Sequence, residues 1–169
     1  MSAMTEGRNT GTNPVRRQYP YKTGLCEGTH VMTLDGNLPV EYLCEGDMVI
    51  TRSGARALRR ITAKPLKDCP ILVLRSALGP NRPSRDMYLA PDQAVHLQDW
   101  RGKVQYGSDQ RAVPLARLVD HNFIQWAEHP GELLVYELEF LTQQVFYAEG
   151  LEVMSTASPL RVIQGIAAA

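Results

Sequence analysis

The sequence predicts an all-β fold. Short apolar runs alternate with Gly, Pro, Asp and Asn through the middle of the chain, which is the pattern of short strands joined by turns. Helical periodicity is weak throughout. A third observation is the dipeptide Asp35-Gly36 between two apolar stretches, because these residue types reach the positive φ values that a two-residue hairpin loop needs.

The most regular part of this pattern runs from Gly28 to Thr51. Asp35-Gly36 is expected to join two strands as a hairpin, and Glu45-Gly46-Asp47 supplies a second turn before the apolar run Met48-Val49-Ile50. The sequence therefore predicts the order strand, hairpin, strand, turn, strand.

Further strands are expected after this segment, at Ala55–Ile61, Ile71–Arg75, Met87–Ala90, Ala94–Gln98, Phe123–Ala127, Leu133–Phe140 and Gln144–Ala148. The polar, turn-rich stretches Gly79–Pro83 and Asp99–Asp109 are expected to be surface loops. The segments Val40–Asp47 and Val113–Asp120 share a spacing of apolar residues that hints at an internal duplication, although chance explains so faint a likeness better.

Length and composition favour one domain. The chain has 169 residues, of which 44% are hydrophobic, enough for one full core. Residues 1–22 are polar and carry four basic side chains against one acid, so we expect a disordered basic arm. Residues 157–169 are expected to form a tail.

The charge balance and the cysteine content limit which partners and which cellular compartment we expect. Eighteen basic residues balance eighteen acidic ones, so no overall field favours nucleic acid, and net charge does not predict a partner. For a binding module we expect a protein partner of unknown identity. No membrane span or N-terminal signal is visible. Three cysteines without C-x-x-C spacing predict reduced thiols and a cytoplasmic protein, and export by a route without a signal stays open. The oligomeric state is not predicted.

Four segments, in order along the chain, resemble the Hint (hedgehog/intein) domain family and in particular a bacterial subfamily of it. They are Gly28-Thr29 with the following Val40-Glu41-Tyr42-Leu43 and Gly46-Asp47-Met48-Val49, then Leu89-Ala90-Pro91-Asp92-Gln93, then Val113-Pro114-Leu115-Ala116, and finally Ala148-Glu149-Gly150-Leu151. The resemblance implies a compact, horseshoe-like Hint fold of two related β subdomains over residues 23–156.

The resemblance also implies a chemistry, from which this chain departs at three positions. Family members break their own backbone with a Cys or Ser placed five residues before the Thr of the Gly-Thr pair, and here that residue is Gly24. Gln93 stands where the family has the histidine that protonates the leaving nitrogen, and Gln143 stands where it has a further histidine. An amide cannot exchange a proton near neutral pH, so the resemblance implies a degenerate site.

One catalytic alternative stays open at Cys26. On a strand, Cys26 faces the same side as Gly24, and a thiol there could attack the carbonyl of Leu25. An ordinary thiol is mostly protonated at neutral pH, so Cys26 needs a nearby base or cation. His30 could assist only if the strand bends. A cysteine that merely packs in the core is the commoner case.

Other chemistries find little support. Asp35, Asp47 and Asp92 with His30 and His96 lack metal-ligand spacing. On a strand, His96 points away from the face of Gln93, so we expect a strand residue with a satisfied ring. No nucleotide or hydrolase motif occurs in the right context, so no cofactor is expected.

Three further features have plainer explanations than catalysis. His121-Asn122 lies too far from the chain end to act as a splicing pair, and His129 is expected in a loop beside a turn. Neighbouring Arg59 and Arg60 point to opposite faces of a strand, so they do not predict a continuous phosphate-binding stripe.

Two hypotheses follow for the function. The first is a Hint domain that has kept its fold, lost self-cleavage and serves as a binding or structural module. The second is an autoprocessing protein that cuts its own backbone between Leu25 and Cys26 through a thioester.

Overall fold

The computed structural model describes residues 23–97, 112–128 and 132–157. The first half of the described chain contains β1 (Leu25–Cys26), β2 (His30–Thr33), β3 (Gly36–Pro39), the 3₁₀ helix η1 (Val40–Tyr42), β4 (Met48–Thr51), β5 (Gly54–Ala57) and β6 (Arg60–Pro65). The second half contains β7 (Ile71–Val73), β8 (Met87–Leu89), β9 (Ala94–His96), β10 (Ala112–Pro114), the 3₁₀ helix η2 (Leu115–Leu118), β11 (Ile124–Trp126), β12 (Leu134–Phe140), β13 (Val145–Ala148), β14 (Leu151–Met154) and β15 (Thr156–Ala157).

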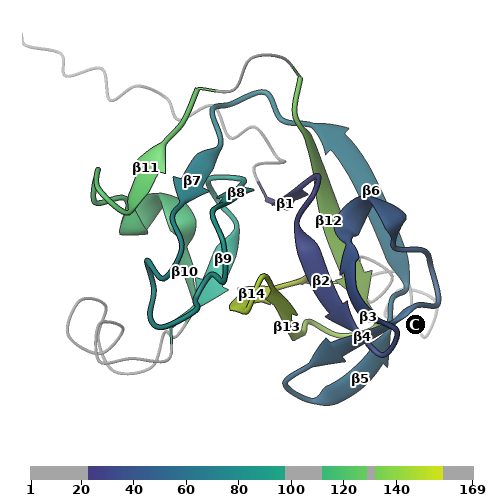
Figure 1. Cartoon of the computed structure of the whole chain (residues 1–169). Coiled ribbons are helices and arrows are strands. Elements are labelled where there is room, and N and C mark those ends of the chain that lie inside the picture. Colours follow the sequence, from purple (N-terminus) through teal and green to yellow (C-terminus); the bar gives the residue numbers. More distant parts are fainter. Residues whose placement is uncertain (1–22, 98–111, 129–131, 158–169) are drawn as a thin grey trace, which may run out of the picture.

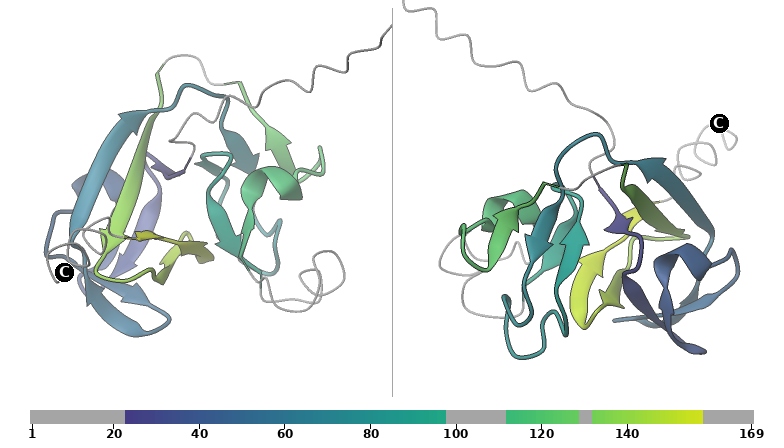
Figure 2. Two further views of the ribbon diagram at one scale, coloured as in Figure 1. Left: turned by 180° about the vertical axis from the view of Figure 1, so that it is seen from behind. Right: turned by 45° about the horizontal axis from the view of Figure 1, so that its top comes forward.

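These strands form two sheets, so the predicted all-β class is confirmed. Within the described residues, the first sheet has the order β11-β7-β8-β1-β12-β15, with β6 also paired to β12, and the second has the order β10-β9-β14-β13-β2-β4-β5, with β3 also paired to β2. Figure 1 shows β7 to β11 in one arm, β2 to β6 with β12 in the other, and β13 and β14 between them. The rotated views in Figure 2 show the same two arms.

The two tight hairpins in the arm that contains β2 to β6 have the same hydrogen bonds from a threonine side chain. In the β2–β3 hairpin, the hydroxyl of Thr33 donates to the carbonyl of Gly36 at 2.7 Å and accepts from the amide of Asp35 at 3.1 Å. The β4–β5 hairpin repeats these bonds with Thr51, Gly54 and Ser53. Because Thr33 pairs with Gly36, Leu34-Asp35 form the two-residue loop, and the prediction of Asp35-Gly36 was wrong by one residue.

The predicted strand Ala55–Ile61 is divided in the structure. The amide of Leu58 donates to Asp47 at 2.8 Å, whereas the amide of Arg59 donates to Glu139 at 2.9 Å. The chain therefore crosses from the second sheet to the first between these two residues, which is why β5 and β6 are separate strands.

One local arrangement occurs in both halves of the chain. The amides of Thr29 and Gln93 each donate to the carbonyl three residues earlier, and their own carbonyls accept from Val40 at 2.8 Å and Leu115 at 3.0 Å. In each half a proline then precedes a 3₁₀ helix. Val40 occupies the position of Leu115 in this arrangement and not that of Val113, so the alignment of Val40–Asp47 with Val113–Asp120 is not the one that the backbone shows.

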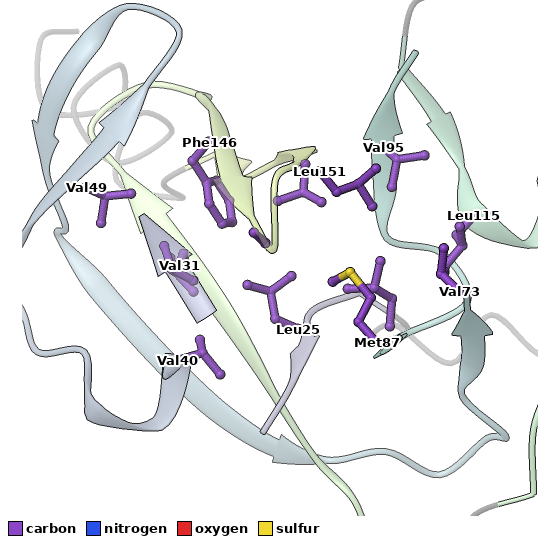
Figure 3. Packing of buried hydrophobic residues seen from close by; sticks show 14 of the residues in the cluster. Leu25, Val31, Val40, Val49, Val73, Met87, Val95, Leu115, Phe146 and Leu151 are labelled. Atoms are coloured by element: carbon purple, nitrogen blue, oxygen red, sulfur yellow. The ribbon is translucent and has the colours of Figure 1, made fainter. Parts of the chain in front are cut away.

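The core joins the two halves around β1. Leu25 pairs with Leu89 of β8 and with Tyr136 of β12, and its side chain is buried. In Figure 3 it lies between residues of one arm, such as Val31, and residues of the other, such as Met87. The residues that lead into β1 are therefore held at the centre of the fold.

Candidate functional site

Gly24 lies directly before β1, and both its amide and its carbonyl are hydrogen bonded. Its amide donates to Oε1 of Gln93 at 3.0 Å, and its carbonyl accepts from the amide of Ala90 at 3.2 Å. Its φ is +131°, a conformation that residues with a side chain rarely adopt. Gly24 and Gln93, which the resemblance predicts to belong to one site, are therefore brought together.

A side chain at this position would be tightly packed. An ideal Cβ on Gly24 would lie 3.0 Å from the carbonyl oxygen of Tyr136 and 3.1 Å from Cβ of Val135. Both neighbours belong to β12, which pairs with β1. A cysteine or serine would therefore require the backbone of β1 or β12 to move.

The side chain of Gln93 is fixed by three hydrogen bonds. Besides accepting from Gly24, it donates through Nε2 to the carbonyls of Met154 at 2.8 Å and Ala94 at 3.1 Å. Gln93 is buried, so these bonds satisfy groups that water does not reach. The amide links β1, β9 and the end of β14.

Three polar residues meet at Thr23, the residue before Gly24. The hydroxyl of Thr23 donates to the carboxylate of Glu137, whose other oxygen lies 3.0 Å from Nζ of Lys64. Sequence reasoning missed this cluster, because Thr23 and Glu137 are separated by 114 residues and neither belongs to a motif.

Cys26 is buried in an apolar cluster with Ala90, Leu133 and Val135. Burial, with a smaller contribution from the charge of Glu27, raises the pKa of its thiol to about 12. At neutral pH the thiol is therefore protonated, and the thiolate is the form that acts as a nucleophile.

The ring of His30 is engaged by Glu149 and Arg85. Its Nδ1 lies 3.0 Å from Oε1 of Glu149 and also contacts Arg85, and its backbone amide donates to the same carboxylate oxygen at 2.7 Å. Arg85 donates to that oxygen at 2.6 Å and to the carbonyl of Gly28 at 2.7 Å. Together these bonds tie the β13–β14 turn to the start of β2.

A similar cluster surrounds His96. Its Nδ1 lies 2.8 Å from Oε2 of Glu152, and its Nε2 lies 3.0 Å from Nη1 of Arg52. His96 is on β9, so the expectation of a strand residue with a satisfied ring is confirmed. The clusters of His30 and His96 both use an acid from the β13–β14 hairpin.

The remaining predicted residues lie apart from these contacts. Gln143 is exposed and donates to the carbonyl of Ser155 at 3.3 Å. His121 has a φ of +63° and lies beside Asn122 in the turn before β11. His129 and the predicted loop Asp99–Asp109 lie outside the described residues.

The surface holds a small hollow beside the β1–β2 turn. It has a volume of about 160 Å³ and is lined by Glu27, Gly28, Thr29, Arg85, Asp86, Met87, Tyr88 and Glu149. Within the residues that the structure covers, no group of three His, Cys, Asp or Glu side chains could hold a metal ion. No helix in that part of the chain is long and apolar enough to cross a membrane.

Comparisons with solved structures show the same fold in inteins. The gp41-1 intein superposes with a TM-score of 0.53 at 13% identity, covering 77% of this chain and 97% of its own. The bacterial intein-like domain from Clostridium thermocellum superposes with a TM-score of 0.51 at 11% identity, covering 79% of this chain and 99% of its own. At these identities the likeness concerns the fold alone.

The family is shown by the sequence itself. No curated protein matches the chain. The family model described as the Hint domain matches residues 23–158, which is most of the chain and includes Gly24, Cys26, Gln93 and Gln143. The chain therefore belongs to the Hint domain family.

Proposed function

We propose that this protein is a Hint domain that does not cleave its own backbone and that serves as a binding or structural module. The observation that carries the proposal is the geometry at Gly24. Self-cleavage needs a nucleophilic side chain next to the scissile bond, and glycine provides none. The close approach of Tyr136 and Val135 to this position supports the view that the surroundings have adapted to the glycine.

The hydrogen bonds of Gln93 support the same conclusion. A leaving amide nitrogen must receive a proton as its bond breaks. Here the amide of Gly24 donates its own proton to Gln93 Oε1, and the Nε2 of Gln93 is occupied by two carbonyls. The contact holds the peptide in place and offers it no acid.

The competing hypothesis is cleavage between Leu25 and Cys26. It requires Cys26 to be deprotonated by a nearby group. The burial of the thiol and its pKa of about 12, together with the engagement of His30 by Glu149 and Arg85, argue against such activation.

The intact mass of the full-length protein, followed over a day with and without dithiothreitol, tests the proposal. We expect an unchanged mass of 18.9 kDa in both conditions. A species that begins at Cys26, forms faster with thiol and is absent from Cys26→Ala would establish thioester cleavage and overturn the proposal. Cys44→Ala is the matched control, because Cys44 is exposed and distant in the sequence from the proposed cut.

A further inference from the structure

The strand β5 forms one edge of the second sheet. It pairs with β4 on one side, and within the described residues no strand pairs with its other side. The register places Arg56 opposite Val49 and Ala57 opposite Met48. Because Leu58 donates to Asp47 across the same ladder, the backbone groups of Arg56 face β4 and those of Ala55 and Ala57 face outward.

Two other edges of this fold are blocked in ways that β5 is not. At β11, the outward amide of Ile124 donates to the Asp120 carboxylate at 2.9 Å, and its carbonyl accepts from the amide of Asp120 at 3.0 Å. The strand β3 ends in Pro39, which has no amide proton to offer. On β5, Ala57 is exposed and Ala55 is half-buried, and both have small side chains.

The segment that contains β5 is basic in sequence. Residues 48–67 contain six Lys and Arg side chains and no Asp or Glu, although Arg52 and Lys64 pair with Glu152 and Glu137. Three of them, Arg56, Arg59 and Arg60, are exposed and lie on β5 or directly after it. The guanidinium of Arg56 donates to the outward carbonyl of Ala55 at 3.2 Å, which places its positive charge at the open edge.

We infer that the β5 edge is a docking site for an extended, acidic segment of a partner protein. Such a segment adds a strand beside β5, where the outward backbone groups of Ala57 and the amide of Ala55 offer hydrogen bonds, and it replaces the Arg56 guanidinium at the carbonyl of Ala55. Its carboxylates meet Arg56, whose guanidinium lies at the edge, and then the exposed Arg60 at the start of β6, and arginine binds carboxylates with paired N–H groups. The inference rests on the proposed function, since it names the partner of a module that does not cleave.

Nucleic acid fits this surface less well. The outward backbone groups of β5 match those of a peptide strand, and a phosphate backbone cannot continue a sheet.

Fluorescence anisotropy with labelled peptides tests the inference on the full-length protein. The probe alternates Glu with Thr over about ten residues, long enough to cover one strand, and its control replaces each Glu by Lys. We expect saturable binding of the acidic peptide and none of the basic one. The paired variant Arg56→Glu with Arg60→Glu should weaken binding at least about tenfold, corresponding to the loss of roughly 1.4 kcal/mol. Arg75→Glu makes one such change of charge outside this segment and should leave binding unchanged.

A second pair of variants tests the backbone contact. Ala57→Pro removes the outward amide proton without touching the ladder to β4 and should also weaken binding about tenfold, the effect of one lost hydrogen bond. Ala57→Val keeps the amide and should bind as the parent does. Equal binding of both peptides, or affinity unchanged in both the Arg and the Pro variants, would overturn the inference.

The outcomes separate this inference from the proposed function. Absence of peptide binding by a protein of unchanged mass rejects the docking site alone, whereas a new species in the mass experiment rejects the proposed function whatever the peptides do. Tighter binding of duplex DNA than of the acidic peptide would assign the arginines to nucleic acid and also overturn the inference.

Discussion

Substituting Gly24 by alanine measures how closely the fold has adapted to a residue without a side chain. Two costs are expected. A residue with a Cβ at a φ of +131° loses about 1–2 kcal/mol of stability through backbone strain. Forcing a methyl group to 3.0 Å from the Tyr136 carbonyl oxygen and 3.1 Å from Val135 adds about 1–2 kcal/mol, as overpacking does elsewhere. The total is about 2–4 kcal/mol.

Gly28→Ala is the matched control. Gly28 also has a positive φ, +82°, but nothing lies within 4 Å of a Cβ built there, so only the strain of about 1–2 kcal/mol is expected. Urea denaturation of both variants and the parent compares their free energies of unfolding, provided that the slope m of free energy against urea concentration is the same in all three. If Gly24→Ala were no less stable than Gly28→Ala, the argument that the site excludes a nucleophile on steric grounds would be refuted.

Three further predictions concern single side chains. Gln93→Ala leaves buried backbone groups without partners and should lower the free energy of unfolding by about 2–4 kcal/mol, without producing any new species in the mass time course; a neutral effect in urea would contradict the contacts described. Although burial opposes the ionisation of Asp120, three backbone amides of its own turn outweigh burial and lower the pKa of its carboxyl, so its contribution is complete above the ordinary pKa of an aspartate and is lost as the pH falls through the lowered folded value. Asp120→Asn should therefore reduce the loss of stability in acid, measured as the urea midpoint against pH. If the urea midpoint of Asp120→Asn fell with decreasing pH as steeply as that of the parent, Asp120 would not be the source of this loss. Finally, a thiol reagent should modify the exposed Cys44 and Cys69 in the native protein and the buried Cys26 only after unfolding, and fast native labelling of Cys26 would revive the cleavage hypothesis.

Local features of the fold were predictable from the sequence, because they depend on neighbouring residues. The strands β7, β8, β11, β12 and β13 lie within or almost within the predicted ranges. The strand β14 was not predicted. It is buried at three of its four positions. It therefore lacks the alternation of apolar and polar residues that identifies a strand with one solvent-exposed face in a sequence.

The contacts of the candidate site were not predictable, because they join distant parts of the chain. Gly24 and Gln93 are 69 residues apart, and His30 and Glu149 are 119 apart. The family resemblance pointed to Gly24 and Gln93, but only the structure shows that one hydrogen bond connects them. Nothing in the sequence around His30 indicates that its ring is held by Glu149 and Arg85.

Gln93 has a structural role that does not depend on catalysis. Gln93 in the second half corresponds to Thr29 in the first, since both carbonyls accept from the first residue of a 3₁₀ helix. The side chain of Gln93 adds a tie from this position to Gly24. Replacing Gln93 by histidine would restore a group that can carry a proton, but it would also exchange an amide that makes three hydrogen bonds for a ring with two nitrogens. Replacing Gly24 by cysteine would bring a side chain into contact with β12. Gly24 and Gln93 are thus the two ends of one packed contact, and we expect that Gly24→Cys combined with Gln93→His permits cleavage only if β1 and β12 also move apart.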